Sequence, residues 1–177
     1  MYAGIDLGIK KSGIAIIKGT KAEVFTLENE KIKELVEKAK VVAVDAPTTY
    51  GEIWRDCDRA VFWANPLPLS LPFMKELMKE GMKLRKELGE KLIETFTNGI
   101  RKVLGVKAED LGYQTNKKLN KHEKDALLIA FTAFLHRYRA TQSYGKECKI
   151  WLPIREVGEV LRAVSYTHLT LPTTERV

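Results

Sequence analysis

Cysteine is scarce in this sequence, with only Cys57 and Cys148 among 177 residues. Two cysteines without a CxxC pair indicate neither a disulfide framework nor a zinc site, so we expect two separate thiols. Long apolar runs are absent too, since none approaches the roughly 20 residues that a membrane-spanning helix needs. No basic segment followed by an apolar one opens the chain, as it would in a secretory signal. These absences predict a soluble, cytoplasmic protein.

Aspartate is also rare, although acidic residues as a class are not. The chain has six Asp and 17 Glu. Because glutamate suits exposed helix faces, the few aspartates are the acids to place one by one. Basic residues are in excess, and the formal net charge is +7. This charge favours partners that carry phosphate, but a composition rich in Lys and Glu is also typical of heat-adapted proteins.

The hydrophobic pattern predicts one mixed α/β domain with a five-stranded sheet flanked by helices. Residues 1–9, 11–19 and 21–29 are strands joined by tight turns, which indicates an antiparallel meander. A helix over 30–40 leads to a buried strand over 41–46, which we expect to run parallel to an earlier strand. Further along we predict a helix over 73–89, a strand over 90–99, helices over 100–106 and 119–140, a candidate strand over 146–153 and a helix over 154–162.

Two segments stand apart from this pattern. Four prolines interrupt residues 47–73, so we expect an irregular insertion of about 47–89, including its helix, within a single domain of 1–162. The last stretch, VSYTHLTLPTTERV, has no helical or strand period. It resembles a translated sequencing adapter, so we expect residues 163–177 to be non-native, which leaves the native C-terminus open.

Two aspartates lie at the ends of predicted strands. Asp6 shares a strand face with Gly4 and Gly8, a face without bulk that lets another group approach closely. Asp45 ends the buried strand VVAV. Ligands of open α/β sheets bind beyond the carboxyl ends of parallel strands. If the two strands are parallel neighbours about 4.8 Å apart, both carboxylates point into one crevice.

A third aspartate comes from the long helix. Asn120 has the pattern of an N-cap, and Glu123 completes a capping box, which places Asp125 in the second turn. Three carboxylates from two strand ends and a helix start suit Mg²⁺ or Mn²⁺. Two such ions about 3.5–4 Å apart can activate water and stabilise the leaving oxygen in phosphodiester cleavage.

Structural explanations for these acids stay open. Asp45 is a good residue to start a turn before Pro47. Asp125 is favourable near the positive end of the helix dipole without any ligand. His122 is either an exposed residue at the helix start or a group that supports the site.

Several short motifs occur in order: GIDLGIKKSGIAI, VVAVDAP, RDCDR, IET and HEKDALLIAFTA. Over roughly residues 1–153 they resemble the family called domain of unknown function 429, whose members are predicted nucleases of RNase H-like fold. The wider superfamily, which includes RuvC-like resolvases, carries acids on its first strand, its fourth strand and a late helix. The resemblance thus implies an RNase H-like domain with Asp6, Asp45 and Asp125 as catalytic metal ligands.

The same resemblance implies a fourth catalytic acid, Glu94. The family usually has an apolar pair and a proline after this acid, whereas this chain has Thr95, Phe96 and Thr97. By strand alternation Glu94 shares a face with Leu92 and Phe96. A half-buried salt bridge is therefore an open alternative for Glu94.

Basic residues gather around the predicted acids, at three places in the sequence. Each group is placed to meet phosphate, although solvated lysines are common in a lysine-rich protein. Trp54, Phe62 and Trp63 either stack on unpaired bases or belong to the core. The helix over 73–89 forms a lid or a face for a partner. We expect six residues to contact substrate: Lys10, Arg55, Arg59, Lys118, Lys121 and His122.

Together these features predict a nuclease that hydrolyses DNA or RNA with Mg²⁺ or Mn²⁺. One alternative is a non-catalytic RNase H-like domain that binds nucleic acid or protein. Another is a fragment of an actin-like phosphotransferase or ATPase, because GIDLGIKKSG resembles a phosphate-binding turn, but the chain is too short and holds no second copy. The oligomeric state stays open, with a dimer among the options.

Overall fold

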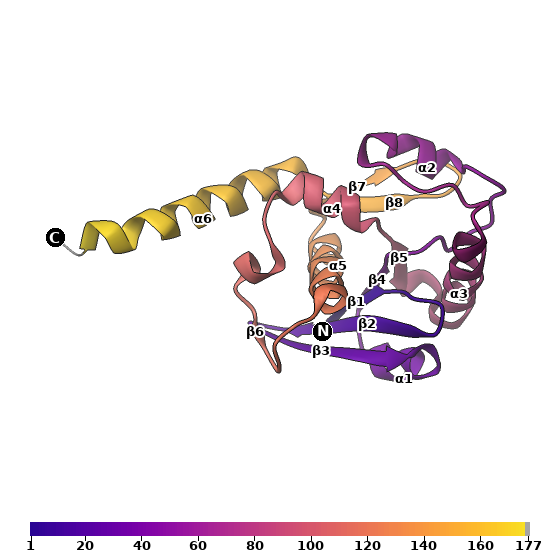
Figure 1. Cartoon of the computed structure of the whole chain (residues 1–177), viewed down its shortest axis with the longest axis horizontal. Helices are drawn as coiled ribbons and strands as arrows, with labels where there is room; N and C mark the ends of the chain where they lie inside the picture. The colour runs from indigo at the N-terminus through magenta and orange to yellow at the C-terminus, as the bar shows by residue number, and fades with distance from the viewer. Residues whose placement is uncertain (176–177) are drawn as a thin grey trace.

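The computed structural model describes residues 1–175, with side chains to residue 165, and folds them around one mixed sheet. The predicted fold class, an α/β domain with antiparallel and parallel strands between helices, is confirmed (Figure 1). The sheet has eight strands in this region rather than five, in the order β6-β3-β2-β1-β4-β5-β8-β7. Their bounds are β1 Tyr2–Asp6, β2 Lys11–Lys18, β3 Lys21–Glu28, β4 Val41–Val44, β5 Leu92–Glu94, β6 Gln114–Thr115, β7 Thr141–Tyr144 and β8 Ile150–Pro153.

The additional strands are short and lie at the two edges of the sheet or next to them. β6 has only two residues and pairs with β3, so no alternation marks it in the sequence. β7 is the polar stretch TQSY, which forms a hairpin with β8. Neither strand has the buried, β-branched composition from which a strand is predicted.

The centre of the sheet has the predicted connectivity. β1, β2 and β3 form the antiparallel meander, and β4 pairs with β1 in parallel, with Ile5 opposite Val44. β5 continues the parallel part beside β4. β1 and β4 are apolar on both faces because helices cover both, as parallel strands require.

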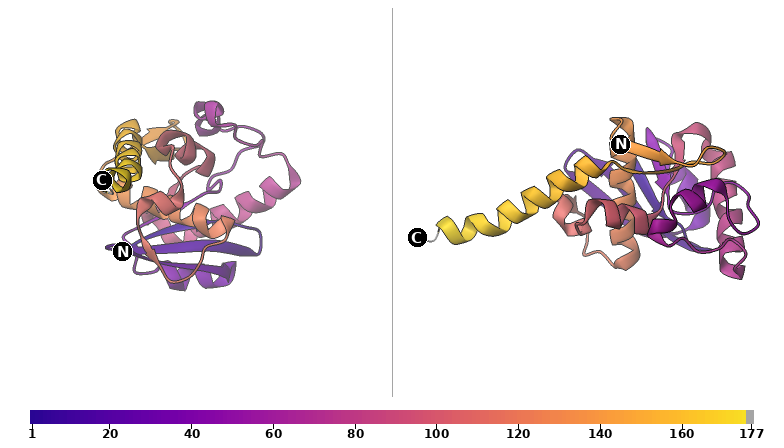
Figure 2. Two further views of the ribbon diagram at one scale, coloured as in Figure 1. Left: turned by 60° about the vertical axis from the view of Figure 1, so that its left-hand side comes forward. Right: turned by 90° about the horizontal axis from the view of Figure 1, so that it is seen from above.

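Helices cover the two faces of the sheet unequally. α5 crosses one face, while α1 and α3 lie on the other, where Ile32, Val36 and Leu84 pack against Ala3 and Ile5 (Figures 1 and 2). The α-helices are α1 Ile32–Val36, α2 Asp56–Ala60, α3 Pro72–Leu88, α4 Thr97–Leu104, α5 Lys121–Arg137 and α6 Arg155–Glu175. Short 3₁₀ turns are η1 Asn29–Lys31, η2 Phe62–Ala64, η3 Gly89–Lys91 and η4 Ala108–Leu111.

Glycine in β1 sets the distance between α5 and the sheet. A Cβ atom on Gly4 would lie 2.1 Å from the backbone nitrogen of Ala130, so any side chain there would push the helix away. A Cβ atom on Gly13 in β2 would lie 2.8 Å from the carbonyl oxygen of His122. The start of α5 therefore packs directly on the carboxyl end of β1, next to Asp6.

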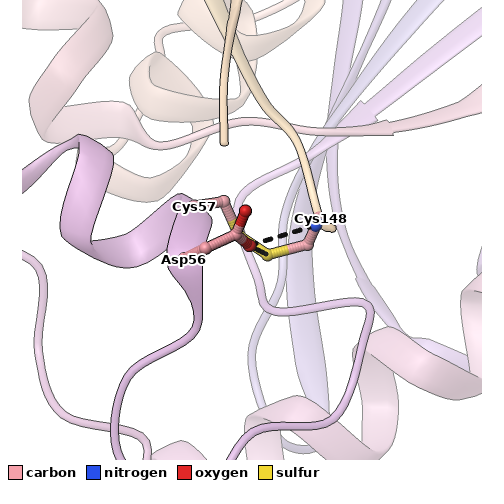
Figure 3. Close-up of side chains that lie close together, drawn as sticks. All are labelled: Asp56, Cys57 and Cys148. Atoms are coloured by element: carbon pink, nitrogen blue, oxygen red, sulfur yellow. Dashed lines mark hydrogen bonds between the residues drawn. A yellow bond between two sulfur atoms is a disulfide. The ribbon is translucent and has the colours of Figure 1, made fainter. Parts of the chain in front are cut away.

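The insertion is more ordered than its prolines predict. Residues 47–73 include α2 and η2, and α3 follows as expected. The prediction of two separate thiols is wrong, because Cys57 in α2 and Cys148 form a disulfide across 91 residues (Figure 3). Asp56 accepts hydrogen bonds from the backbone N–H groups of Lys146, Glu147 and Cys148 at 2.5, 2.8 and 3.2 Å. These contacts attach the insertion to the loop between β7 and β8, a pairing that two isolated cysteines in a sequence do not reveal.

The final helix extends beyond its predicted end. α6 runs from Arg155 to Glu175 rather than over 154–162, and its outer part leads away from the rest of the molecule (Figures 1 and 2). Its first turns are anchored on α4, where Arg162 donates hydrogen bonds to the carbonyl groups of Val103 and Leu104. The domain limit at residue 162 and the non-native tail stay predictions. Among the described helices, none combines the length and the apolar character that crossing a membrane requires.

Candidate functional site

Asp6 and Asp45 lie at neighbouring carboxyl ends of the sheet. Asp6 is the last residue of β1, and Asp45 follows β4 and donates its backbone N–H to the carbonyl of Ile5 at 3.0 Å. Tyr2 and Ala43 pack in the same core cluster as α5. Because strand residues alternate between faces, Asp6 and Asp45 lie on that face too. The predicted crevice between β1 and β4 therefore faces the start of α5.

The start of α5 brings two further polar residues to this crevice. The predicted capping box is present, with Asn120 and Glu123 exchanging hydrogen bonds. One turn of helix then places His122 and Asp125 side by side. His122 Nδ1 lies 2.9 Å from Asp6 Oδ2, although the His122 side chain is 75% exposed. The structure thus joins the first strand and the late helix through this pair.

The carboxylates at the crevice disfavour one another's ionised form. The pKa of Asp45 is raised to about 7, mainly by burial and to a smaller extent by the negative charges of Asp6 and Asp125, while hydrogen bonds from Thr97 act to lower it. Burial also raises the pKa of Asp6, with a smaller contribution in the same direction from Asp125, while the hydrogen bond to His122 lowers it. Such mutual repulsion is what a cation between carboxylates relieves.

Two residues of α4, Thr97 and Arg101, complete the crevice. The hydroxyl of Thr97 donates a short hydrogen bond to Asp45 Oδ2, and its backbone N–H lies 3.3 Å from the same oxygen. Arg101 forms an ion pair with Asp125. Neither residue was predicted to belong to the site, because 97–99 were assigned to the end of a strand and Arg101 to a separate helix over 100–106. Four-residue spacing on one helix face is the signal that relates Thr97 to Arg101.

The donor atoms of this crevice fit a hard divalent cation. Carboxylate oxygens of Asp6, Asp45 and Asp125 are the ligand type that Mg²⁺ and Mn²⁺ prefer. The three do not form a close cluster, however. Among the described side chains, metal-ligating atoms gather within 4.8 Å of one another only in the groups Asp56, Cys57, Cys148 and Cys57, Asp58, Glu94.

Glu94 belongs to a different environment from the three aspartates. It lies opposite Val44 in the register of β5 with β4, on the sheet face away from α5. Its Oε1 accepts hydrogen bonds from the Thr48 N–H at 2.9 Å, the Thr48 hydroxyl at 3.0 Å and Arg55 Nη1 at 2.9 Å. Its Oε2 lies 2.6 Å from Arg55 Nη2. Glu94 is thus in the salt bridge that its sequence left open, and a metal-binding role stays a prediction.

Arg55 is buried between two carboxylates. Its Nε and Nη2 donate to Asp58 at 3.0 and 2.8 Å, in addition to its bonds with Glu94. Burial opposes the guanidinium charge, but these hydrogen bonds outweigh it and raise the pKa of Arg55. The Arg55 side chain is buried and faces these two carboxylates. Its contact with substrate therefore stays a prediction. Arg59, in α2 just after Arg55, is exposed.

The remaining predicted substrate residues lie at the surface. Lys10, Lys118 and Lys121 are exposed. A surface groove beside α5 is lined by Asp125 together with four basic residues: Arg101, Lys107, Lys121 and Lys124. Glu109 and Asp110 also line this groove, and Glu109 pairs with Lys124 at 2.7 Å. The groove therefore brings Lys121 and the newly found Arg101 to one of the three aspartates.

The aromatic residues of the insertion are divided between packing and exposure. Trp54 is half-buried, with its ring centroid 4.9 Å from that of Phe62. Phe62 and Trp63 are both exposed, and Trp63 lies 5.9 Å from Tyr144. The positions of Trp54, Phe62 and Trp63 therefore allow both predicted roles, packing against one another and contact with a ligand.

The arrangement of the sheet, with α5 across one face, is that of an RNase H-like fold of the RuvC type. A structure of RuvC from T. thermophilus in complex with a Holliday junction substrate is similar at 18% sequence identity and a TM-score of 0.51. The match covers 77% of this chain and 94% of that chain. A further structure of Thermus thermophilus RuvC has 19% identity and a TM-score of 0.47, covering 77% and 95%.

Comparison of the sequence with known families and proteins does not assign this chain to a family. No family model matches the chain, and no curated protein sequence matches it. Membership of the domain of unknown function 429 family therefore stays a prediction. At this level of identity the structural likeness supports the fold alone.

Proposed function

We propose that this protein is a metal-dependent nuclease that hydrolyses phosphodiester bonds. The observation that carries the proposal is the crevice between β1 and β4, where Asp6 and Asp45 face Asp125 of α5. Burial, together with the charges of neighbouring carboxylates, raises the pKa of Asp6 and Asp45. Among the described side chains, Arg101 pairs with Asp125 and His122 with Asp6, whereas Asp45 forms no ion pair. Carboxylates whose pKa is raised in this way are typical of functional sites.

Asp6, Asp45 and Asp125 would hold Mg²⁺ or Mn²⁺ in this proposal. The cation would supply charge neutralisation at the scissile phosphate and lower the pKa of the attacking water. Thr97 fixes the orientation of Asp45 through its hydroxyl and N–H, and His122 does the same for Asp6. Arg101 and Lys121, at the edge of the groove, are placed to contact phosphate oxygens.

Glu94 has a positioning role in this scheme. Its carboxylate holds Thr48, three residues after Asp45, through both the N–H and the hydroxyl of that threonine. The chain leaving the crevice is therefore tied to the buried pair of Glu94 and Arg55. The predicted role of Glu94 as a further catalytic acid would require that pair to open.

Nucleic acid is the proposed substrate. The RuvC neighbour carries a Holliday junction, and this chain has a net charge of +7 with basic residues along the groove beside Asp125. Contacts of Lys and Arg with phosphate release counterions, so binding should weaken steeply as salt is raised. Lys10, Arg59 and Lys118 are exposed and would add to this term, whereas Arg55 would act through Glu94.

The test is cleavage of a labelled panel of single strand, duplex, RNA–DNA hybrid and four-way junction with Mg²⁺ or Mn²⁺. Asp45→Asn keeps the shape of the side chain and removes its charge, and Glu52→Gln removes a charge from the exposed surface as a matched control. We expect metal-dependent cutting by the wild type and by Glu52→Gln, and none by Asp45→Asn or with a chelator. Cutting that survives Asp45→Asn would refute the proposal.

A non-catalytic nucleic-acid-binding domain is the second candidate. One observation favours it: Arg101 forms an ion pair with Asp125, and His122 pairs with Asp6. In that case the wild type and Asp45→Asn would bind the panel alike, metal would not change their affinity, and no substrate would be cut.

A further inference from the structure

A cavity opens directly beside the candidate catalytic carboxylates. Its volume is about 220 Å³, and both Asp6 and Asp45 line it. Leu67 and Phe73 line it as well, and since these side chains are 49% and 48% exposed, the cavity reaches the surface. It therefore connects solvent with the crevice between β1 and β4.

The walls of the cavity are mainly apolar. They include Leu69 of the insertion, three residues of α3 (Phe73, Met74 and Leu77) and Phe96. Pockets for drug-sized ligands measure about 300–1,000 Å³, so this smaller space suits a single ring system. Apolar walls do not hold a phosphate or a sugar hydroxyl, whereas they favour the flat face of an aromatic ring.

Polar groups also line the same cavity. Arg55, Asp58 and Glu94 contribute to its lining, together with Thr95. A planar ring with hydrogen-bonding atoms on its edge would meet both the apolar walls and these polar side chains. A nucleobase has this combination, and a purely apolar ligand does not.

The cavity and the basic groove border the candidate site from different directions. They share no lining residue: Asp6 and Asp45 line the cavity, whereas Asp125 lines the groove together with Arg101 and Lys121. The three carboxylates thus lie between an apolar cavity and a cationic groove. A nucleotide at the site can place its phosphate at the carboxylates and its backbone in the groove while its base enters the cavity.

We propose that the cavity binds one nucleobase that is not base-paired, next to the cleaved phosphodiester. This inference rests on the proposed nuclease function, and it narrows the substrate to nucleic acid with an unpaired or easily extruded nucleotide. Enzymes that take a base out of the stack must break its stacking and pairing, which is easiest where the base is already unpaired. A bulge, a mismatch or a single strand therefore serves as substrate, and a fully paired duplex does not.

The first test measures binding rather than cutting, with Ca²⁺ as the divalent ion. Three end-labelled duplexes are compared by fluorescence anisotropy: one with a single bulged nucleotide, one with a bulged abasic sugar, and one fully paired. The wild type should bind the bulged base about tenfold more tightly than the abasic bulge, on the scale of one base–aromatic contact. Equal affinity for the two bulges would overturn the proposal, as would failure to bind any of the three.

Two variants locate the effect in the cavity. Met74→Trp fills it from α3, and Phe73→Ala removes part of its rim at an exposed position where folding is least at risk. Both should reduce the tenfold preference to near one. Met82→Trp is the matched control, because Met82 is an exposed residue of the same helix that does not line the cavity. An undiminished preference in both cavity variants would exclude the cavity as the base site.

Cleavage of the same duplexes separates this proposal from the proposed function. If the wild type prefers the bulged base but cuts nothing with Mg²⁺ or Mn²⁺, the nuclease function fails and the base site stands. If the wild type cuts the bulged and abasic duplexes equally well, the nuclease function stands and the base site fails. If Met74→Trp impairs cutting of both bulges equally, the cavity acts through structure and not through a base, which also overturns the proposal.

Discussion

Two groups of acids lie at the carboxyl edge of this sheet, one buried and one half-buried, and they differ in what neutralises them. Glu94 and Asp58 face Arg55, whose guanidinium hydrogen-bonds both carboxylates. Asp6 and Asp45, on the α5 side, have the hydrogen-bond partners His122 and Thr97, and among the described side chains neither forms an ion pair with an arginine. The first group, Glu94 and Asp58 with Arg55, is neutralised within the protein, and we call it the closed group. The second group, which together with the neighbouring Asp125 we call the open group, is incomplete, because burial and nearby negative charge raise the pKa of Asp6 and Asp45.

This difference distinguishes acids that stabilise the fold from acids that bind a ligand. A buried carboxylate with a matched cation needs nothing from outside, so its removal should affect folding. A buried carboxylate without such a cation lowers stability when it is ionised, so its removal should affect ligand binding and leave the fold intact or more stable. Substitutions in the two groups should therefore change stability in opposite directions.

The largest effect should come from Arg55→Leu. Removing this cation leaves Asp58 and Glu94 buried without compensation, which costs about 3–5 kcal/mol in comparable ion pairs. The free energy of unfolding, measured with denaturant at neutral pH, should fall by that amount. Arg59→Leu, four residues further along and exposed, should change it by less than about 0.5 kcal/mol. Equal effects of the two variants would show that the pair with Glu94 adds nothing.

The disulfide supports the same closed group from outside. Cys57 follows Arg55 by two residues in the insertion and is bonded to Cys148 at the β7–β8 loop. The double variant Cys57→Ala, Cys148→Ala should lower the free energy of unfolding by about 2–4 kcal/mol, as expected for a bond that closes a long loop. Reducing agent should lower the stability of the wild type by a similar amount and leave the double variant unchanged. A wild type indifferent to reductant would contradict this role.

How far the sequence predicts these two groups depends on the range of the interactions. Asp6 and Asp45 could be placed because each ends a strand whose apolar pattern is local, and Asn120 with Glu123 marks the start of α5. Thr97 and Arg101 were missed because β5 is only three residues long, so its end was set too late. The contacts of Arg55 and Cys57 join positions 39 and 91 residues apart, and no local pattern encodes them.

In the open group, Asp45→Asn should stabilise the protein at neutral and higher pH. Asp45 has a pKa of about 7 in the fold against 3.8 ordinarily. Between pH 3.8 and about pH 7, the folded chain keeps a proton on Asp45 that the unfolded chain releases. The free energy of unfolding therefore falls as pH rises through this range. Each pKa unit corresponds to about 1.4 kcal/mol and partial exposure reduces the effect, so we expect a gain on the order of 2 kcal/mol at pH 8.

Thermal unfolding of the wild type and Asp45→Asn between pH 4 and pH 8 measures this effect. The two proteins should be similar near pH 4 and diverge as pH rises, while Glu52→Gln should follow the wild type. If Asp45→Asn is less stable than the wild type at pH 8 without metal, the ionised Asp45 is already neutralised within the protein. The proposed difference between the two groups of acids would then be wrong.

The smallest effect concerns Arg101, which gives the open group its only arginine contact among the described side chains. Because Arg101 is bonded to Asp125, it competes with a divalent cation for that carboxylate. The Arg101 side chain is 40% exposed, and half-exposed ion pairs contribute up to about 1 kcal/mol, so Arg101→Gln should tighten Mn²⁺ binding by at most about fivefold. Calorimetric titration with Mn²⁺ measures this, with Lys102→Gln as the control that removes the same charge from the neighbouring position. Weaker Mn²⁺ binding by Arg101→Gln would mean that the arginine orients Asp125 for the cation and does not compete with it.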